Sequence, residues 1–140
     1  MTEGDSKGVE FTEGMRLLLC LIRQRWTVYA FGRRHQPDAL GAVITGLRFT
    51  DVVIIRGHDR ASAYRTICDE PGADPLSAPL VVWHYLGSVA PTIRAALGLP
   101  SRDEAGTDFG VPYAIPDECR VPEIDRRPYT VRPPQAVRQR

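Results

Sequence analysis

The chain of 140 residues is long enough for one domain with a real core, and at 43% hydrophobic and 25% charged residues it has the composition of a globular protein. Eighteen basic and seventeen acidic side chains give a net charge of +1, which excludes a polycationic binder of nucleic acid or membranes. All but one of the basic residues are arginine, the exception being Lys7, and this skew indicates a bacterial genome of high GC content.

Cysteine usage and hydropathy indicate the compartment. Cys20, Cys68 and Cys119 are an odd set without regular spacing, which favours reduced thiols over a secreted disulfide framework. The longest apolar run, Leu17 to Ile22, has six residues, whereas a membrane span needs roughly twenty. The fourteen residues before Met15 carry four acidic side chains and one lysine, the wrong sign for an export signal. We therefore expect a soluble, cytoplasmic protein with no membrane contact.

The first elements predicted along the chain are a disordered lead, a helix and a strand. Residues 1–10 are polar and contain glycine, as a disordered lead does. From Thr12 to Arg25 the apolar residues recur with helical spacing, and the expected buried stripe is Met15, Leu18, Leu19 and Ile22. The β-branched and aromatic run Trp26 to Phe31 then predicts a strand.

The middle of the chain predicts a helix and two central strands. Pro37 suits a first helical turn, so a helix over Pro37–Thr45 is expected, with one apolar face formed by Leu40, Val43, Ile44 and Leu47. Val52–Arg56 and Leu80–Tyr85 are apolar on both alternating faces. Strands of that kind need cover on both sides, so we expect the two runs to be adjacent or nearly adjacent at the centre of one sheet.

The segment Asp59–Ile67 fits two structures. Its apolar residues can form a helical stripe, and they can also alternate as in a strand that returns through a turn at Gly57–Arg60. We favour the strand, because Gly57, His58 and Asp59 supply suitable turn chemistry.

A last helix and a proline-rich arm complete the chain. Ser88 is a suitable N-cap for a helix over Val89–Leu97, and Gly98 a suitable end. Residues 100–140 hold seven of the twelve prolines, with recurrent apolar residues and charge that is acidic first and basic later. The predicted fold is one small mixed α/β or α+β domain over residues 11–99, with about four strands and helices on both faces. An extended proline-rich arm follows it and is expected to lie partly against the domain.

Signatures of catalysis and of cofactor or metal binding are absent from the sequence. It contains no G-x-G of a dinucleotide site, no phosphate-binding loop, no nucleophile elbow and no cysteine pair for zinc. We therefore expect no cofactor, no metal site and no catalytic residue, and an enzyme is the less favoured class.

The main alternative is a ligand pocket at the sheet edge. His84 ends an apolar strand, where it is either a neutral core histidine with one partner or a group poised to bind a ligand. Arg33 and Arg34 follow the first predicted strand. If the two strands run parallel, the arginines and His84 could hold a phosphate or carboxylate between them, and a solvated loop is the competing interpretation.

Two adjacent residues, His58 and Asp59, could join such a pocket. An adjacent His–Asp pair is also the metal-binding signature of the HD phosphohydrolases, but that family is helical, whereas this pair follows a strand-like run. A polar turn is the favoured interpretation, and we expect no metal there.

The basic end of the arm is the candidate partner-binding segment, with the residues Arg126, Arg127, Tyr129 and Arg132. Arginine beside an aromatic ring can also bind single-stranded nucleic acid, although the chain lacks a wider basic field. The sequence thus favours a non-enzymatic interaction or regulatory module whose arm docks on a protein partner. The alternatives are a protein or enzyme that binds a small anionic ligand, and an accessory nucleic-acid binder.

Overall fold

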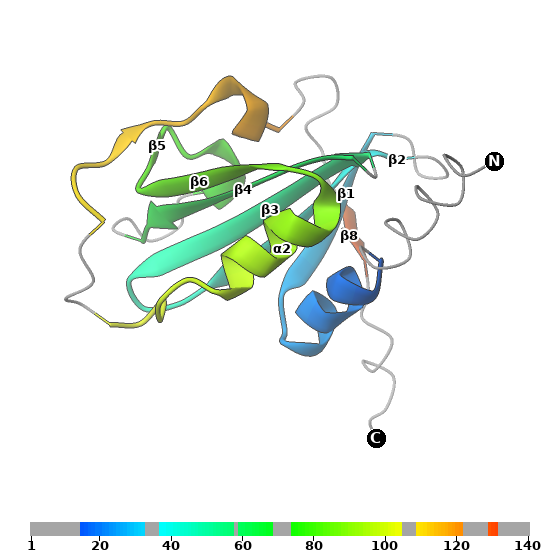
Figure 1. Cartoon of the computed structure of the whole chain (residues 1–140), viewed down its shortest axis with the longest axis horizontal. Coiled ribbons are helices and arrows are strands. Elements are labelled where there is room, and N and C mark those ends of the chain that lie inside the picture. The colour runs from blue at the N-terminus through cyan, green and yellow to red at the C-terminus, as the bar shows by residue number, and fades with distance from the viewer. Residues whose placement is uncertain are drawn as a thin grey trace.

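The computed structural model describes residues 15–32, 37–57, 59–68, 74–104, 109–121 and 129–131. In these ranges the chain forms a small α+β fold with a six-stranded sheet, a two-stranded sheet and two α-helices (Figure 1).

An antiparallel meander forms the centre of the larger sheet. The strands of this sheet are, in chain order, β1 (Thr27–Gly32), β2 (Pro37–Thr45), β3 (Phe49–Gly57), β4 (Arg60–Ile67), β6 (Trp83–Gly87) and β8 (Tyr129–Val131). β6 pairs with β4 and β8 pairs with β1, so the spatial order is β6-β4-β3-β2-β1-β8. Every pairing is antiparallel, and therefore β1 to β4 need only short turns between them.

Both α-helices cover one face of this sheet, which we call the helix face (Figure 1). A helix over residues 15–23 and α2 (Val89–Leu97) share a core with side chains of the sheet. The buried members of that core are Leu18, Leu21, Ile22, Trp26, Val28, Ala42, Val53, Ala61, Ala63, Val89, Ile93 and Ala96. The prediction of α2 is confirmed, and Gly98 ends the helix by donating its N–H to the last free carbonyls.

The opposite face is covered by segments that lie far apart in the sequence. They are the 3-10 turn η1 (Pro75–Ser77), β5 (Leu80–Val81), β7 (Tyr113–Ala114) and the 3-10 turn η2 (Asp117–Cys119), of which β5 and β7 pair as the smaller sheet. The core beneath them consists of Phe31, Ala39, Val43, Val52, Ile54, Tyr64, Val81, Ile115, Cys119 and Val121. Residues 109–121, which we call the strap, thus cross this face, and we call it the strap face.

The N-terminal helix confirms part of the predicted apolar stripe. Leu18 and Ile22 are buried as expected, but Leu21 is fully buried as well, while Met15 and Leu19 are exposed. The helix is therefore rotated relative to the predicted face, because the sheet and Trp26 contact it along the side that carries Leu21. Such a rotation depends on the partner surface, which a helical spacing alone does not specify.

The predicted helix over Pro37–Thr45 is wrong, since this segment is β2. Neighbouring side chains turn to opposite faces: Ala42 belongs to the core of the helix face and Val43 to that of the strap face. β1 and β3 provide hydrogen-bonding partners along both edges of the segment. A glycine-weakened helix loses to these partners, and Gly41 is useful here because a Cβ would stand 3.0 Å from the ring of Phe31.

The two predicted central strands have different outcomes. Val52–Arg56 lies within the central strand β3, as predicted. The run Leu80–Tyr85 does not form a central strand: it bends at Val82 into β5 and the edge strand β6. The segment Asp59–Ile67 supplies β4 in its place beside β3, which confirms the preferred hairpin. The expected helices on both faces are also wrong within the described ranges, because η1 and the strap cover the second face.

Candidate functional site

Several of the residues predicted as site residues lie outside the described ranges. These are Arg33, Arg34, His58, Arg126, Arg127 and Arg132. Asp59 is exposed in the turn before β4, and the backbone of Tyr129 opposes Ala30 in the pairing of β8 with β1. His84 is thus the one predicted pocket residue that lies within a described strand.

His84 lies far from the end of β1. The register that starts at His84 runs across β4, β3 and β2 to Thr27 on β1. Gly32, the last residue of β1, therefore lies four strands away from His84 across the sheet and five residues away along the strand direction. In an ideal sheet these separations are about 19 Å across and about 16 Å along. The two strands do run in the same direction, but the described backbone does not bring their ends into one pocket.

The partner of His84 is instead a tyrosine of the strap. His84 Nδ1 lies 2.7 Å from Tyr113 Oη, and the two rings meet edge to face with centroids 5.7 Å apart. Partial burial raises the pKa of Tyr113, and Cys119 adds to this shift. The tyrosine therefore remains a neutral hydroxyl at ordinary pH, and the pair joins β6 to the strap.

Arg56 fixes the other end of the strap. Its guanidinium donates to the carbonyl of Glu118 at 2.6 Å and to the carbonyl of Arg120. Between these attachments Ile115 donates its N–H to the Pro79 carbonyl at 3.0 Å. The strap is thus held to β3, to β6 and to the segment that leads into β5.

A buried thiol lies under the strap. Burial raises the pKa of Cys119 to about 11, and the neighbouring Ser62 side chain only partly opposes this shift. The reactive thiolate is thereby disfavoured. Cys119 is a packing residue in this environment.

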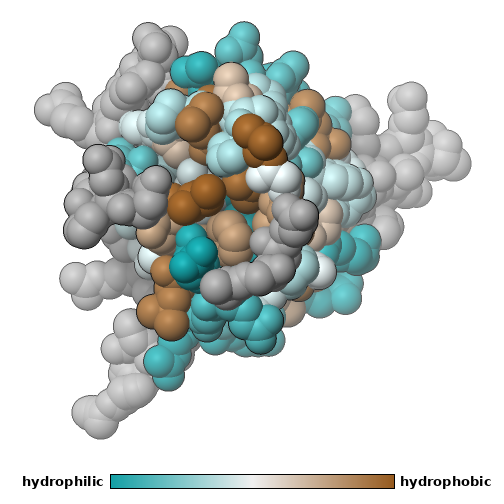
Figure 2. Space-filling view, turned by 90° about the vertical axis from the view of Figure 1, so that its left-hand side faces the viewer, coloured by the Kyte–Doolittle hydropathy of each residue, from teal (hydrophilic) through white to brown (hydrophobic). Residues whose placement is uncertain are grey.

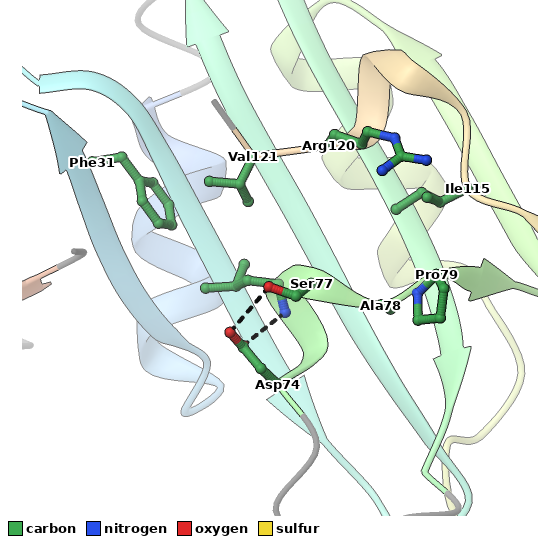
Figure 3. A pocket seen from close by; sticks show the side chains of 9 residues that line it. Phe31, Asp74, Ser77, Ala78, Pro79, Ile115, Arg120 and Val121 are labelled. Carbon is green, nitrogen blue, oxygen red and sulfur yellow. Dashed lines mark hydrogen bonds between the residues drawn. The ribbon is translucent and has the colours of Figure 1, made fainter. Parts of the chain in front are cut away.

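The first pocket, shown in Figure 3, lies on the strap face between η1 and the strap and has a volume of about 190 Å³. Its apolar walls include Phe31, Ile115 and Val121. Its polar groups already have partners: Asp74 accepts hydrogen bonds from the Leu76 N–H and the Ser77 hydroxyl, and Arg120 pairs with Asp117 at 3.3 Å. The polar side chains do not converge on the pocket as a catalytic set would.

A second pocket of about 220 Å³ lies at the end of β6, beside Leu86 and Gly87. Its charged lining residues are Arg56, Asp59, Arg60 and Glu118. Two cations are thus balanced by two anions, which gives no net attraction for a small charged ligand.

A buried ion pair bridges β3 and β4 on the helix face. Asp51 and Arg65 stand directly opposite in the register, with Nε–Oδ1 at 2.6 Å and Nη2–Oδ2 at 2.9 Å. Arg102 reaches the same carboxylate at 3.4 Å. The Arg65 guanidinium also lies 5.0 Å and 5.4 Å from the ring centroids of Phe49 and Phe109. This bidentate pair fixes the register of the central strands, and neither pocket includes it.

Exposed apolar side chains gather at one end of the sheet. Of the eight large hydrophobic residues that are exposed in the described ranges, five lie there, and we call them the end patch: Leu47, Ile67, Leu80, Val111 and Tyr113. Figure 2 shows apolar atoms gathered among polar ones on this side of the molecule. Exposed apolar side chains that gather at one end of a fold can mark an interaction site, whereas single scattered ones need no explanation.

Contacts within the fold hold the separate segments of the end patch together. The Thr66 hydroxyl donates to the Leu80 carbonyl at 2.9 Å, which places Ile67 beside β5. Leu80 opposes Ala114 and Val81 opposes Tyr113 in the smaller sheet, so β5 joins the end of β4 to the strap. The segments come from the β2–β3 turn, β4, β5 and the strap, and only folding brings them together.

Sequence reasoning missed the end patch. One signal was available, since Val111 stands between Gly110 and Pro112, and Leu47 follows Gly46 in a turn. Apolar residues in such positions have no regular element to bury them.

The comparisons with known proteins complete this description. No family model, no curated protein and no solved structure matches the chain. In the described ranges, no helix has the length and apolar character that a membrane crossing requires. Nor do the described residues contain a cluster of three or more groups suited to a metal ion.

Proposed function

We propose that this protein is a non-enzymatic interaction module that binds a protein partner at the end patch. The observation that carries the proposal is the concentration of exposed apolar residues at one end of the sheet. Leu47 and Val111 are 79% and 84% exposed. Covering such side chains stabilises a complex by about 25 cal/mol for each Å² of apolar surface removed from water.

The C-terminal arm takes part as a docking element through its strap. Val111 and Tyr113 belong to the strap, and Arg56 and His84 hold the strap to the sheet. A partner would therefore meet a surface that is already ordered, which lowers the entropic cost of binding compared with a free tail. A single domain then combines a scaffold with a preformed apolar surface.

The alternative of a small anionic ligand has less support. The described strands separate His84 from the end of β1, and the Asp74 and Arg120 side chains at the first pocket already have partners. Oriented, unsatisfied donors are what anion recognition needs, and the end patch offers apolar contact instead.

The test compares a variant of the end patch with a matched control. Full-length protein carrying Leu80→Glu and Val111→Glu is immobilised beside the unaltered protein and a Leu19→Glu variant. Leu19 is 41% exposed and Leu80 49%, but Leu19 lies on the N-terminal helix. We expect a partner from the native lysate to be retained by the unaltered and Leu19→Glu proteins and lost from the double variant. Circular dichroism checks that all three are folded.

Two results would count against the proposal. One is a partner retained equally by all three proteins, which would place binding outside the end patch. The other is the absence of any specifically retained protein.

A further inference from the structure

Within the part of the chain that the structure describes, the edge strand β6 has neither a paired strand on its outer side nor the charges and prolines that normally protect a sheet edge. β4 pairs with one side of β6, and no described strand pairs with the other side. Its residues, Trp83–Gly87, include no Lys, Arg, Asp, Glu or Pro. Natural proteins usually protect an open edge with charges, prolines, bulges or a cover, because its unpaired N–H and C=O groups can pair with another chain.

The side chains of β6 form an apolar row on the helix face. Trp83 and Tyr85 are stacked with their ring centroids 6.5 Å apart. The Tyr85 ring continues over Gly87, where a Cβ would stand 3.1 Å from Cε1. On the strap face the strand carries His84 and Leu86, and Leu86 is 43% exposed. The edge therefore presents no acidic residue, lysine or arginine on either face.

We propose that β6 pairs antiparallel with β6 of a second copy of this chain, about a two-fold axis at Tyr85. Two six-stranded sheets then become one continuous sheet. This goes beyond the proposed function, because it concerns a different surface and a different partner. It also removes the open edge, and a two-fold contact of this kind closes on itself without growing into a fibre.

The register of that pairing explains why the occupant is a second copy. With Tyr85 on the axis, Trp83 lies opposite Gly87 of the second copy, where that copy's own Tyr85 ring already lies over the glycine. The indole would therefore meet an aromatic ring and no charged side chain. His84 lies opposite Leu86 of the second copy, and Tyr85 lies opposite itself.

Self-pairing is also permitted by charge. Like charges directly opposite one another destabilise paired strands, and β6 has none. Beside the Gly87 end, Arg56 and Arg60 are balanced by Asp59 and Glu118. A strand selected for a charged partner would carry complementary charge, whereas β6, which has no acidic residue, lysine or arginine, suits an identical copy.

A charge exchange on the axis tests both the interface and its symmetry. In a dimer of the Tyr85→Lys variant, two lysines would face each other, and in a dimer of the Tyr85→Glu variant two glutamates. We expect the unaltered protein to sediment as a dimer. Each variant alone should dissociate with a dissociation constant raised roughly tenfold or more, from like-charge repulsion and the lost aromatic pair.

An equimolar mixture of the two variants should recover the dimer, because the introduced lysine of one copy would then face the introduced glutamate of the other. Recovery also shows that both variants are folded. Leu19→Lys, which changes an exposed apolar residue on the N-terminal helix, is the control and should remain dimeric. An unaltered protein that stays monomeric at high concentration overturns the proposal, as do variants that remain dimeric alone or a mixture that stays monomeric. The proposed function is tested separately, since none of these changes lies in the end patch.

Discussion

Replacing Asp51 by alanine should be among the most destabilising single substitutions in the sheet. The Asp51 and Arg65 side chains are 1% and 0% exposed, and Asp51 accepts two hydrogen bonds from Arg65. Asp51→Ala leaves the guanidinium buried and without its anion. Phe49 and Phe109 contact its faces but accept no conventional hydrogen bond from its N–H groups. Breaking a buried pair in this way costs about 3–5 kcal/mol.

That loss is large compared with the whole stability of such a domain, which is about 5–15 kcal/mol. The assay is urea unfolding of the full-length protein followed by tryptophan fluorescence. The control is Asp117→Ala, since the pair of Asp117 with Arg120 is exposed on both sides and should give no measurable loss.

The paired variant Asp51→Val with Arg65→Leu separates the charge from the packing. Replacing both ions by apolar residues removes the desolvation cost as well as the attraction, so most of the lost stability should return. We expect a coupling energy of at least about 2 kcal/mol in the double-mutant cycle. Two results would refute this reasoning. One is a single variant that loses less than about 1 kcal/mol of unfolding free energy. The other is a paired variant whose loss of unfolding free energy is as large as the two single losses added together.

Three further predictions concern the core, the strap and the buried thiol. Leu18→Ala should lose roughly 2–5 kcal/mol of unfolding free energy and exposed Leu19→Ala much less; equal losses in chemical denaturation would contradict the observed helix rotation. Ending the chain after Pro100 should lower the melting temperature, because it removes the strap. Ending it after Val131 keeps both the strap and β8, and should leave the melting temperature unchanged. If both truncated proteins melt at the temperature of the full chain, the strap does not contribute to stability. Because burial raises the pKa of Cys119 from 9.0 to about 11, the folded state holds this proton more tightly than the unfolded state. This contribution is complete below about pH 9 and declines as the pH rises to about 11. A Cys119→Ala variant should show less of that decline in unfolding free energy, and an identical decline would contradict it.

The sequence by itself determined those elements whose residue pattern is compatible with only one secondary structure. α2 has a helical stripe and a terminal glycine, and it forms over Val89–Leu97 as expected, although the side chain of Ser88 at the N-cap makes no capping hydrogen bond. The run Val52–Arg56 is apolar on both faces, and such a strand is stable only at the centre of a covered sheet. It lies in β3, between β2 and β4. Here local propensity and burial favour the same structure.

Where two structures satisfied the same pattern, tertiary contacts decided between them. Pro37–Thr45 matches a helical face and also an alternating strand, and the free edges of β1 and β3 selected the strand. Leu80–Tyr85 matches a central strand, but β4 already occupies the position beside β3. The run therefore divides at Val82. Hydrogen-bond partners and neighbours in space carry this information, and a single-sequence pattern does not contain them.

The candidate surfaces depend most strongly on tertiary structure. The end patch joins residues from the β2–β3 turn, β4, β5 and the strap, and β6 is an edge only because of the order of the strands. Composition and motif content indicated a module without familiar catalytic signatures. Which apolar side chains remain exposed depends on which surfaces the fold fails to cover, and only the packing of distant segments determines that.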